Sequence, residues 1–406
     1  MFITNEKIML KEQLRQSIHA QENWLKGTEE GVGREILSDI PLKNLYISVI
    51  SGIRRSGKST LLRQLMNHYS NPVYFNFEDH RVYDFEVGDF EKLDQILAEQ
   101  NPDAWFFDEI QNVKGWERYV RSAHDQGRKI FITGSNANLL SRELGTKLTG
   151  RYLQYLLFPF SYREFLTFKN LDPGSESLEK YMLTGGFPEY IKMNDTGILQ
   201  QLFEDIIMRD VVVRYEIRQE EILKSLALFL ISNTGKEFSY NKLSKRFQVG
   251  SVNTIINYVH YLANSFLLSP LSLYTYSLKK RAVNPKKIYA IDTGLIHANT
   301  LSFNDDLGRI LENIVFIELC RHYKEIYYHR NDQECDFVVK KPSGFWSAIQ
   351  VSYALERDNL NRELNGIREV DPSHLDEKLI ITFDQEDWFG DIHAIPAWKW
   401  LSGVKT

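Results

Sequence analysis

The residues best able to do chemistry lie in one glycine-rich segment, GIRRSGKST, at positions 52–60. It matches the pattern G-x-x-x-x-G-K-[ST], in which glycines let a loop curl so that backbone N–H groups point at phosphate oxygens. In this pattern the lysine reaches the β- and γ-phosphates and the next hydroxyl ligates Mg²⁺, which assigns these roles to Lys58 and Ser59. We therefore expect ATP and Mg²⁺ as cofactors. The other residues expected to surround them are Gly52, Arg54, Arg55, Ser56, Gly57 and Thr60.

An acidic pair supplies the second half of the pattern, in AWFFDEI at residues 104–110. A hydrophobic strand that ends in acids places Asp108 at the carboxyl edge of a parallel sheet, where ligands bind. We expect Asp108 to hold the Mg²⁺ shell and Glu109 to act as the general base that polarises the attacking water. Taken alone, solvated acids at a strand end explain this pair equally well. The phosphate loop favours the catalytic interpretation.

The elements around these residues fit the chemistry. The apolar run YISVIS precedes the loop, and a helix is predicted from Lys58 to about His68. The amino end of that helix carries a partial positive charge that favours a bound anion. Further apolar runs, VYFNF, AWFFD, KIFITG and YLQYLLF, alternate with amphipathic helices. This alternation predicts a parallel sheet covered by helices on both faces.

Two further polar residues are candidates for the same site. The run KIFITG ends before Ser135 and Asn136, and Asn136 could bond the γ-phosphate or the attacking water, or cap a helix instead. Arg151, in KLTGRY, is a candidate for neutralising phosphate charge. A lone arginine is more often a surface or salt-bridging residue, so both interpretations of Arg151 stay open.

Seven motifs, in order over most of residues 45–218, resemble those of prokaryotic AAA+-type ATPases that end in a domain of unknown function. They are GIRRSGKST, FFDEIQ, ITGSNANLL, LTGRY, FPFSYREF, GGFPEY and DIIMRDVVVRY. The resemblance implies ATP binding, ATP hydrolysis and a winged-helix segment. Because AAA+ relatives often form rings in which an arginine reaches the neighbouring site, it also implies a homo-oligomer. It implies no defined cellular task.

Residues 237–268 have the rhythm of a helix–turn–helix. Leu243 and Phe247 fit one helix face, Gly250 marks the turn and Ser251 caps the second helix. Four apolar residues fit a face of the second helix, namely Ile255, Ile256, Val259 and Leu262. The residues expected toward its exposed amino end, where base edges are usually read, are Ser251, Asn253, Thr254 and Asn257.

A basic run follows in the predicted hairpin, formed by Lys279, Lys280, Arg281, Lys286 and Lys287. These side chains could grip DNA phosphates. The alternative is a packing module or protein-contact surface whose lysines are simply solvated.

The C-terminal region resembles the PD-(D/E)XK pattern of restriction-endonuclease-like folds. Glu318 on a predicted helix, Asp336 in a strand and Gln350 in the next strand match the acids that assemble one Mg²⁺ site. Glu312, on the same helix, is the alternative to Glu318. Ser352 stands where the pattern requires lysine, so we expect a nuclease-like fold that has lost efficient cleavage. A plain structural domain is the other interpretation.

We therefore predict a multi-domain α/β protein. Its parts are an N-terminal helix and linker (1–42), a P-loop ATPase core with a parallel sheet (43–158), a helical lid (159–218), a winged-helix-like domain (219–300) and a nuclease-like α/β domain (301–406). The predicted function is hydrolysis of Mg-ATP coupled to DNA binding or remodelling. The alternative is a signalling or scaffold ATPase whose nucleotide state controls a protein partner.

Composition limits these possibilities only loosely. The net charge of −5 over 406 residues argues against a uniformly basic nucleic-acid binder but permits a local basic patch. Two cysteines, Cys320 and Cys335, have no metal-like spacing and fit a reducing compartment. Neither a secretory signal nor an apolar run of membrane-spanning length is present in the sequence. We expect a cytoplasmic protein without a membrane partner.

Overall fold

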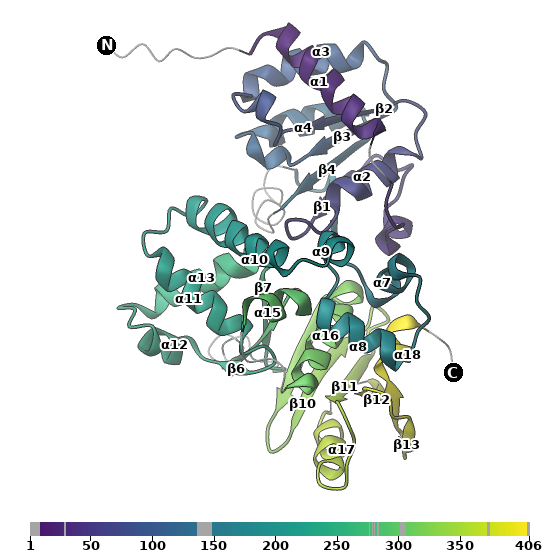
Figure 1. The fold of residues 1–406 in the computed structure, drawn as a ribbon, viewed down its shortest axis with the longest axis vertical. Helices are drawn as coiled ribbons and strands as arrows, with labels where there is room; N and C mark the ends of the chain where they lie inside the picture. The colour runs from purple at the N-terminus through teal and green to yellow at the C-terminus, as the bar shows by residue number, and fades with distance from the viewer. Residues whose placement is uncertain are drawn as a thin grey trace. The chain divides into compact units, whose positions relative to one another are not determined.

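The computed structural model describes residues 9–27, 30–135, 148–275, 277, 279, 281, 284–300, 306–371 and 374–403. The chain divides into two compact units, Met1–Leu157 and Phe158–Thr406. Figure 1 shows the first in purple and blue and the second in teal, green and yellow. Within the described residues, no helix combines the length and the apolar character needed to cross a membrane.

The first unit is built on a five-stranded parallel sheet with the order β2-β3-β4-β1-β5. The strands are β1 (Ile47–Ser51), β2 (Pro72–Asn76), β3 (Ala104–Asp108), β4 (Ile130–Gly134) and β5 (Tyr152–Leu156). The five apolar runs predicted all five strands and their parallel arrangement, and the structure confirms both. Parallel strands end at the same edge of the sheet, so the segments after β1 and β3 meet there.

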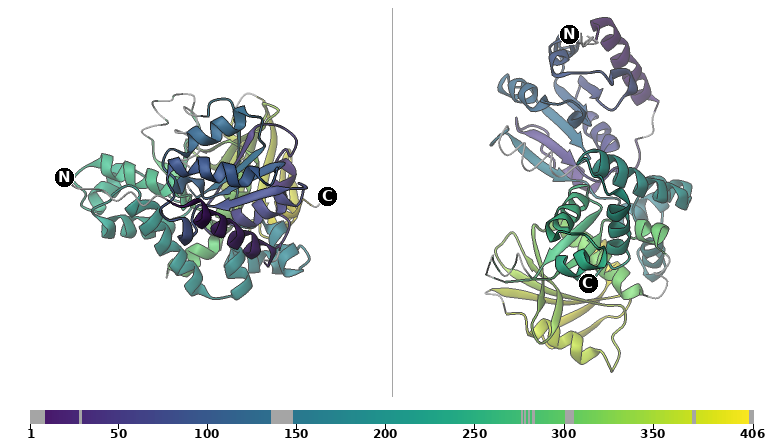
Figure 2. Two further views of the ribbon diagram at one scale, coloured as in Figure 1. Left: turned by 90° about the horizontal axis from the view of Figure 1, so that it is seen from above. Right: turned by 90° about the vertical axis from the view of Figure 1, so that its left-hand side faces the viewer.

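Helices cover both faces of this sheet (Figure 2). Trp105 and Phe107 of β3 point into one core, with α1 (Lys11–Lys26), α3 (Phe90–Ala98) and α4 (Trp116–Asp125). Phe106, between them, points into the other core, with α2 (Lys58–Met66) and η1 (Glu35–Asp39). This alternation is the two-residue period of a strand buried on both sides. Three short 3₁₀ turns complete the unit: η2 (His80–Val82), η3 (Val87–Asp89) and η4 (Ile110–Asn112).

The second unit begins with helices. They are α7 (Tyr162–Lys169), α8 (Ser175–Thr184), α9 (Pro188–Met193), α10 (Thr196–Asp205), the π-helix η5 (Ile206–Val213) and α11 (Glu220–Ile231). Ser161 and Glu164 form a capping box at the start of α7, which explains part of the FPFSYREF motif. The Gly185–Gly186 pair separates α8 from α9, whose first residue is Pro188. The mostly helical character predicted for this stretch is therefore present.

A helical pair and a hairpin follow. The elements are β6 (Glu237–Phe238), α12 (Tyr240–Arg246), α13 (Val252–Asn264), β7 (Leu268–Ser272), β8 (Lys286–Ala290) and α15 (Thr293–Asn299). The three strands form an antiparallel sheet in the order β6-β8-β7. Ser251 caps α13 by accepting a bond from the N–H of Asn253, as predicted. Ile256 was assigned to the buried face, but it is 38% exposed because the next helical step turns it away from Ile255.

The rest of the second unit is a six-stranded mixed sheet with the order β13-β14-β12-β11-β10-β9. Its elements are α16 (Leu307–His322), β9 (Glu325–Arg330), β10 (Glu334–Lys340), β11 (Trp346–Ser352), α17 (Leu360–Arg368), β12 (Leu375–Thr382), β13 (Asp387–Phe389), β14 (Ile392–Pro396) and α18 (Ala397–Ser402). Leu364 and Ile367 of α17 pack on Val338 of β10. Phe316 of α16 contacts Phe337, the residue of β10 next to Val338. A register shift near Asp336 interrupts the pairing of β10 with β9.

Candidate nucleotide site

The predicted phosphate loop connects β1 to α2, and its geometry requires both glycines of the motif. Gly57 is the N-cap of α2 and has a φ of 94°, in the left-handed region that glycine favours. A Cβ added at Gly52 would lie 2.1 Å from the backbone oxygen of Leu157, too close for any other residue. The loop therefore curls back over the start of the helix. This is the shape that aims backbone N–H groups at phosphate oxygens.

Lys58 lies folded over this loop and is almost completely buried. Its Nζ donates to the backbone oxygens of Gly52 (3.1 Å) and Ile53 (3.2 Å). The same ammonium lies 3.4 Å from Oε1 of Glu109. Two of the three partners of Lys58 are neutral carbonyl oxygens and only one is a charged carboxylate. A bound phosphate could therefore take their place around the ammonium.

Asp108 ends β3 and is fully buried. Tyr74 donates its hydroxyl to Oδ2 at 2.8 Å, and the hydroxyl of Thr133 donates to Oδ1. Burial and the negative charge of Glu109 raise the pKa of Asp108. Hydrogen bonds from Ser59, Thr133 and Tyr74 act to lower it. Asp108 is therefore held against Ser59, which brings together two oxygen donors of the type that Mg²⁺ prefers.

Glu109 follows directly and adopts a φ of 51°, a left-handed conformation that is uncommon for a residue with a side chain. Its backbone N–H donates to the hydroxyl of Thr133 at 3.0 Å, and its carboxylate accepts a bond from Gln111. Burial acts to raise the pKa of Glu109, but the charge of Lys58 and the bond from Gln111 lower it. The carboxylate is thus ionised, as a general base must be, and it is engaged by Lys58.

The remaining predicted loop residues surround this core. Arg54 donates to Glu78 at 3.0 Å, Arg55 is exposed, and Thr60 accepts a bond from Arg63 at 3.4 Å. Ser56 is buried, and its Oγ has no hydrogen-bond partner within the described part of the chain. Because a buried hydroxyl normally has a hydrogen-bond partner, the hydroxyl of Ser56 is suited to bonding an oxygen of a ligand.

The sequence did not predict the contacts that hold the phosphate loop from the segment before the sheet. Arg34, which precedes the sheet, is buried and donates to the backbone oxygen of Ser56 at 2.7 Å. Gln64 of α2 donates to the backbone oxygens of Glu30 and Val32, which ties this segment to the helix. Tyr74 and Thr133 were missed as well. Only Thr133 carried a signal, because it lies near the end of the strand before Ser135.

The structure does not bring Arg151 to the site. Its backbone oxygen accepts a bond from Ile47 at the start of β1, so it lies at the amino end of the sheet. The phosphate loop begins at the other end of β1, roughly 15 Å away at about 3.3 Å per residue. The guanidinium pairs with Asp125 at 2.9 Å. The prediction that Arg151 neutralises phosphate charge is therefore wrong for the site of its own chain. Asn136 lies outside the described residues.

The three residues predicted for a second Mg²⁺ site are only partly brought together. Gln350 accepts a bond from the backbone N–H of Asp336 at 3.1 Å. Glu318 instead pairs with Arg321 and His322, each at 3.1 Å. Glu312 lies near Asp336 in place of Glu318, because six residues of helix turn a side chain by about 240°. Glu312 is therefore the helix acid of this cluster.

The basic run is also different from its prediction. Lys287 is buried and bonds to Glu312, Glu334 and Asp336. Lys286 donates to Ser272, and Arg281 stacks on Tyr327, whereas Lys280 lies outside the described residues. Of the described members of the run, Lys286, Lys287 and Arg281 are therefore occupied by contacts within the chain, whereas Lys279 is exposed.

The model of a family described as "AAA domain" matches residues 44–166, which contain the parallel sheet and the loop between β1 and α2. Two domains of unknown function match residues 175–306 (DUF8612) and 307–400 (DUF4143). An uncharacterized protein of Methanocaldococcus jannaschii is 34% identical over 404 residues, which cover 89% of this chain and 90% of that protein. An uncharacterized protein of Haemophilus influenzae is 32% identical over 385 residues, covering 88% and 94%. The chain belongs to the family of these uncharacterized proteins.

Solved structures are more distant. A replication initiator DnaA bound to AMPPCP and single-stranded DNA matches with a TM-score of 0.29 and 15% identity, over 61% of this chain and 88% of that one. The Aeropyrum pernix Orc1 protein in complex with DNA matches with a TM-score of 0.27 and 14% identity, over 76% and 97%. Likeness at this level does not bear on the chemistry of the site.

Proposed function

We propose that this protein is a Mg²⁺-dependent ATPase. The observation that carries the proposal is the contact between Ser59 and Asp108, beside Lys58 and under a glycine loop. The loop N–H groups and the unpartnered hydroxyl of Ser56 would bind phosphate oxygens. Ser59 would ligate Mg²⁺ directly, and Asp108 directly or through water. Bound Mg²⁺ would neutralise charge on the β- and γ-phosphates.

The pairing of Lys58 with Glu109 suggests how hydrolysis is controlled. A γ-phosphate competes with Glu109 for the ammonium of Lys58, which lies 3.4 Å from that carboxylate. Once Lys58 turns to the phosphate, Glu109 is free to accept a proton from water. Thr133 and Gln111 hold the backbone and side chain of Glu109 during this exchange. The base is thus engaged by Lys58 until substrate arrives.

Phosphate release from ATP, measured with and without Mg²⁺, tests this proposal. We expect turnover only with Mg²⁺, and a loss of at least about 100-fold in Asp108→Asn, as for removal of other preorganised charge-stabilising groups. Glu91→Gln, an exposed acid on α3, is the matched control and should keep wild-type turnover. Turnover that is independent of Mg²⁺ or unchanged in Asp108→Asn contradicts the proposal.

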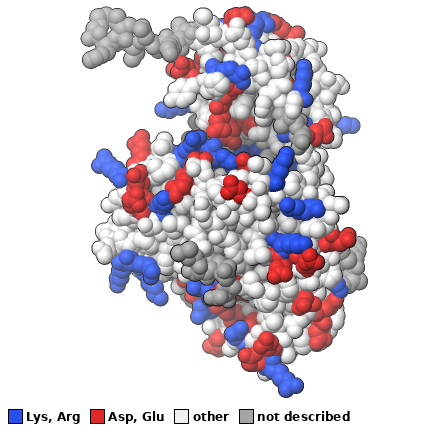
Figure 3. All heavy atoms as spheres, viewed as in Figure 1, with Lys and Arg blue, Asp and Glu red and all other residues white. Residues whose placement is uncertain are grey.

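We further propose that the second unit couples nucleotide state to DNA through a winged helix formed by α11, α12, α13 and the β7–β8 hairpin. Ser251, Asn253 and Asn257 are exposed near the amino end of α13. Since Lys286 and Lys287 are occupied, phosphate contacts would come from α12, where Lys242, Lys245 and Arg246 are exposed. Figure 3 shows Lys and Arg side chains together on the face that carries α12.

One observation favours the alternative, a nucleotide-switched ATPase that acts on a protein partner. Ile256 is 38% exposed between Asn253 and Asn257, on the same surface of α13 that would face DNA. An exposed branched apolar residue suits a protein contact better than a phosphate backbone.

Duplex DNA added to the ATPase assay separates the two proposals. DNA-stimulated turnover that is lost in Lys242→Gln/Lys245→Gln, but kept in Lys180→Gln on α8, supports the DNA proposal. Turnover that ignores DNA, together with a nucleotide-dependent change of mass in light scattering, supports the protein-partner proposal. The same scattering measurement reports whether copies of this chain form a homo-oligomer.

A further inference from the structure

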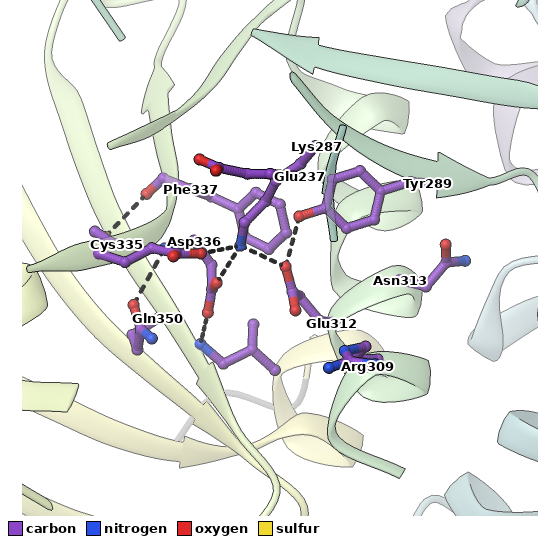
Figure 4. Close-up of polar contacts among 12 residues, drawn as sticks. Glu237, Lys287, Tyr289, Arg309, Glu312, Asn313, Cys335, Asp336, Phe337 and Gln350 are labelled. Atoms are coloured by element: carbon purple, nitrogen blue, oxygen red, sulfur yellow. Dashed lines mark hydrogen bonds and ion pairs between the residues drawn. The ribbon is translucent and has the colours of Figure 1, made fainter. Parts of the chain in front are cut away.

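A buried lysine lies at the centre of the C-terminal acid cluster. Lys287 of β8 has a side chain only 3% exposed. Its Nζ lies 2.9 Å from Glu312 of α16, 2.6 Å from Glu334 and 2.7 Å from Asp336, both of β10. Figure 4 shows Lys287 between Asp336 on one side and Glu312 on the other. One cation therefore joins three carboxylates from two elements.

The ammonium is surrounded by negative charge. It donates hydrogen bonds to Glu312 and Asp336, and it forms an ion pair with Glu334 at 2.6 Å. Burial acts to lower the pKa of Lys287, but the charges of Asp336 and Glu312 raise it well above its usual value. Lys287 thus remains charged.

Further donors hold the acids in place around Lys287. The hydroxyl of Tyr289 donates to Oε1 of Glu312 at 2.6 Å, and the N–H of Val351 donates to Oδ2 of Asp336 at 3.0 Å. The contact between Tyr289 and Glu312 is drawn in Figure 4. Fixed donors therefore hold two of the three carboxylates, Glu312 and Asp336, against the ammonium, and the three together form what we call the oxygen cage.

A cage of this kind is what a divalent metal would need. Mg²⁺ and Mn²⁺ prefer carboxylate oxygens gathered around a single position. That position is filled by the Nζ atom. Within the described residues, no group of three His, Cys, Asp or Glu side chains is arranged to hold a metal ion, and these three acids surround the ammonium instead.

We propose that the ammonium of Lys287 is the resident cation of this cluster, taking the position that a divalent metal would occupy. It closes the cage of Glu312, Glu334 and Asp336 to Mg²⁺ and fastens β8 to α16 and β10. The C-terminal sheet is then locked to the preceding hairpin by an internal ion pair, and it needs no metal for its fold. This inference stands independently of ATP hydrolysis.

Manganese binding to the full chain tests the proposal, with Asp108→Asn in every sample to remove the nucleotide metal site. Electron paramagnetic resonance counts the bound Mn²⁺. We expect no Mn²⁺ site in the cage while Lys287 is present. Lys287→Ala opens space among the three acids and should gain a site at least tenfold tighter than any other. Adding Asp336→Asn should abolish it. Lys287→Met is the matched control, because its stem fills the space, and it should gain none.

Two results overturn the proposal. One is a Mn²⁺ site in the Lys287-containing protein that Asp336→Asn removes, and the other is a folded Lys287→Ala protein that gains no site. Should Lys287→Ala fail to fold, acylation of the unsubstituted protein by an amine-reactive ester decides, with peptide mass spectrometry as the readout. We expect Lys287 to stay unmodified with or without Mn²⁺. Modification that Mn²⁺ induces would show that metal displaces the lysine, and would contradict the proposal.

Discussion

Two buried lysines, Lys58 in the first unit and Lys287 in the second, each lie against carboxylates. Lys58 has two carbonyl partners and one carboxylate, Glu109, with its shortest contact at 3.1 Å. Lys287 has three carboxylates within 2.9 Å. An incoming phosphate can replace the neutral carbonyl partners of Lys58. It cannot displace the three buried carboxylates around Lys287. The partners of a lysine, more than its burial, therefore separate a ligand-binding lysine from a structural one.

The largest expected effect separates the two lysines by activity. Lys58→Ala should lower ATP turnover by at least about 100-fold, because the phosphate charge loses the ammonium of the loop. Lys287→Met should leave the turnover per folded molecule within about twofold of wild type. Steady-state phosphate release, normalised to the folded fraction, measures both. Equal losses in the two variants would remove the distinction.

Stability should show the reverse order. Lys287→Met leaves three carboxylates without their cation and should lower the free energy of unfolding by roughly 3–5 kcal/mol, as for other broken buried ion pairs. Lys58→Met should cost less, because Glu109 keeps its bond from Gln111. Calorimetric melting of the full chain compares them. A Lys58→Met protein that melts below Lys287→Met would contradict this ranking.

A third buried ionisable group, Asp292, should make the free energy of unfolding depend on pH. Burial raises the pKa of Asp292 to about 6, against opposing bonds from the N–H groups of Gly186 and Leu295. Because the folded pKa lies above the usual value of about 3.8, the stabilisation that the protonated carboxyl gives is complete below about pH 4 and is lost as pH rises through 6. The loss should be roughly 3 kcal/mol. Asp292→Asn should flatten this part of the curve of unfolding free energy against pH. An unchanged curve would show that Asp292 does not cause this pH dependence.

The smallest expected effect concerns Arg151. Its pair with Asp125 is partly exposed, so Arg151→Ala should cost at most about 1 kcal/mol of stability. ATP turnover should change less than about twofold, since the guanidinium lies at the far end of the sheet. Turnover and melting temperature on one preparation check this. A large loss of turnover without a loss of stability would indicate that Arg151 serves the site of another copy.

The sequence predicted what lies close along the chain. The loop at Gly52–Thr60 and the acid pair Asp108–Glu109 were recognisable because local strands and a helix position them. Lys287 was assigned to a basic run that could grip DNA phosphates, because its partner Asp336 is 49 residues away and only folding brings the two together. Arg34, Tyr74 and Thr133 act across shorter but still non-local separations, of 22, 34 and 25 residues. The choice between Glu312 and Glu318 depended on which face of α16 meets β10, which the helical pattern alone did not define.

We propose that Glu109 is a base that Lys58 holds until phosphate takes its place. Glu109→Gln tests this most directly, with binding of fluorescent ATP and single-turnover hydrolysis measured on the same sample with Mg²⁺. We predict that Mg-ATP binds about as tightly as to wild type or more tightly, because Lys58 no longer pairs with an anion. Hydrolysis should be slower by roughly 100-fold or more, the usual contribution of a general base. A Glu109→Gln protein that hydrolyses ATP at the wild-type rate would show that Glu109 is not the base.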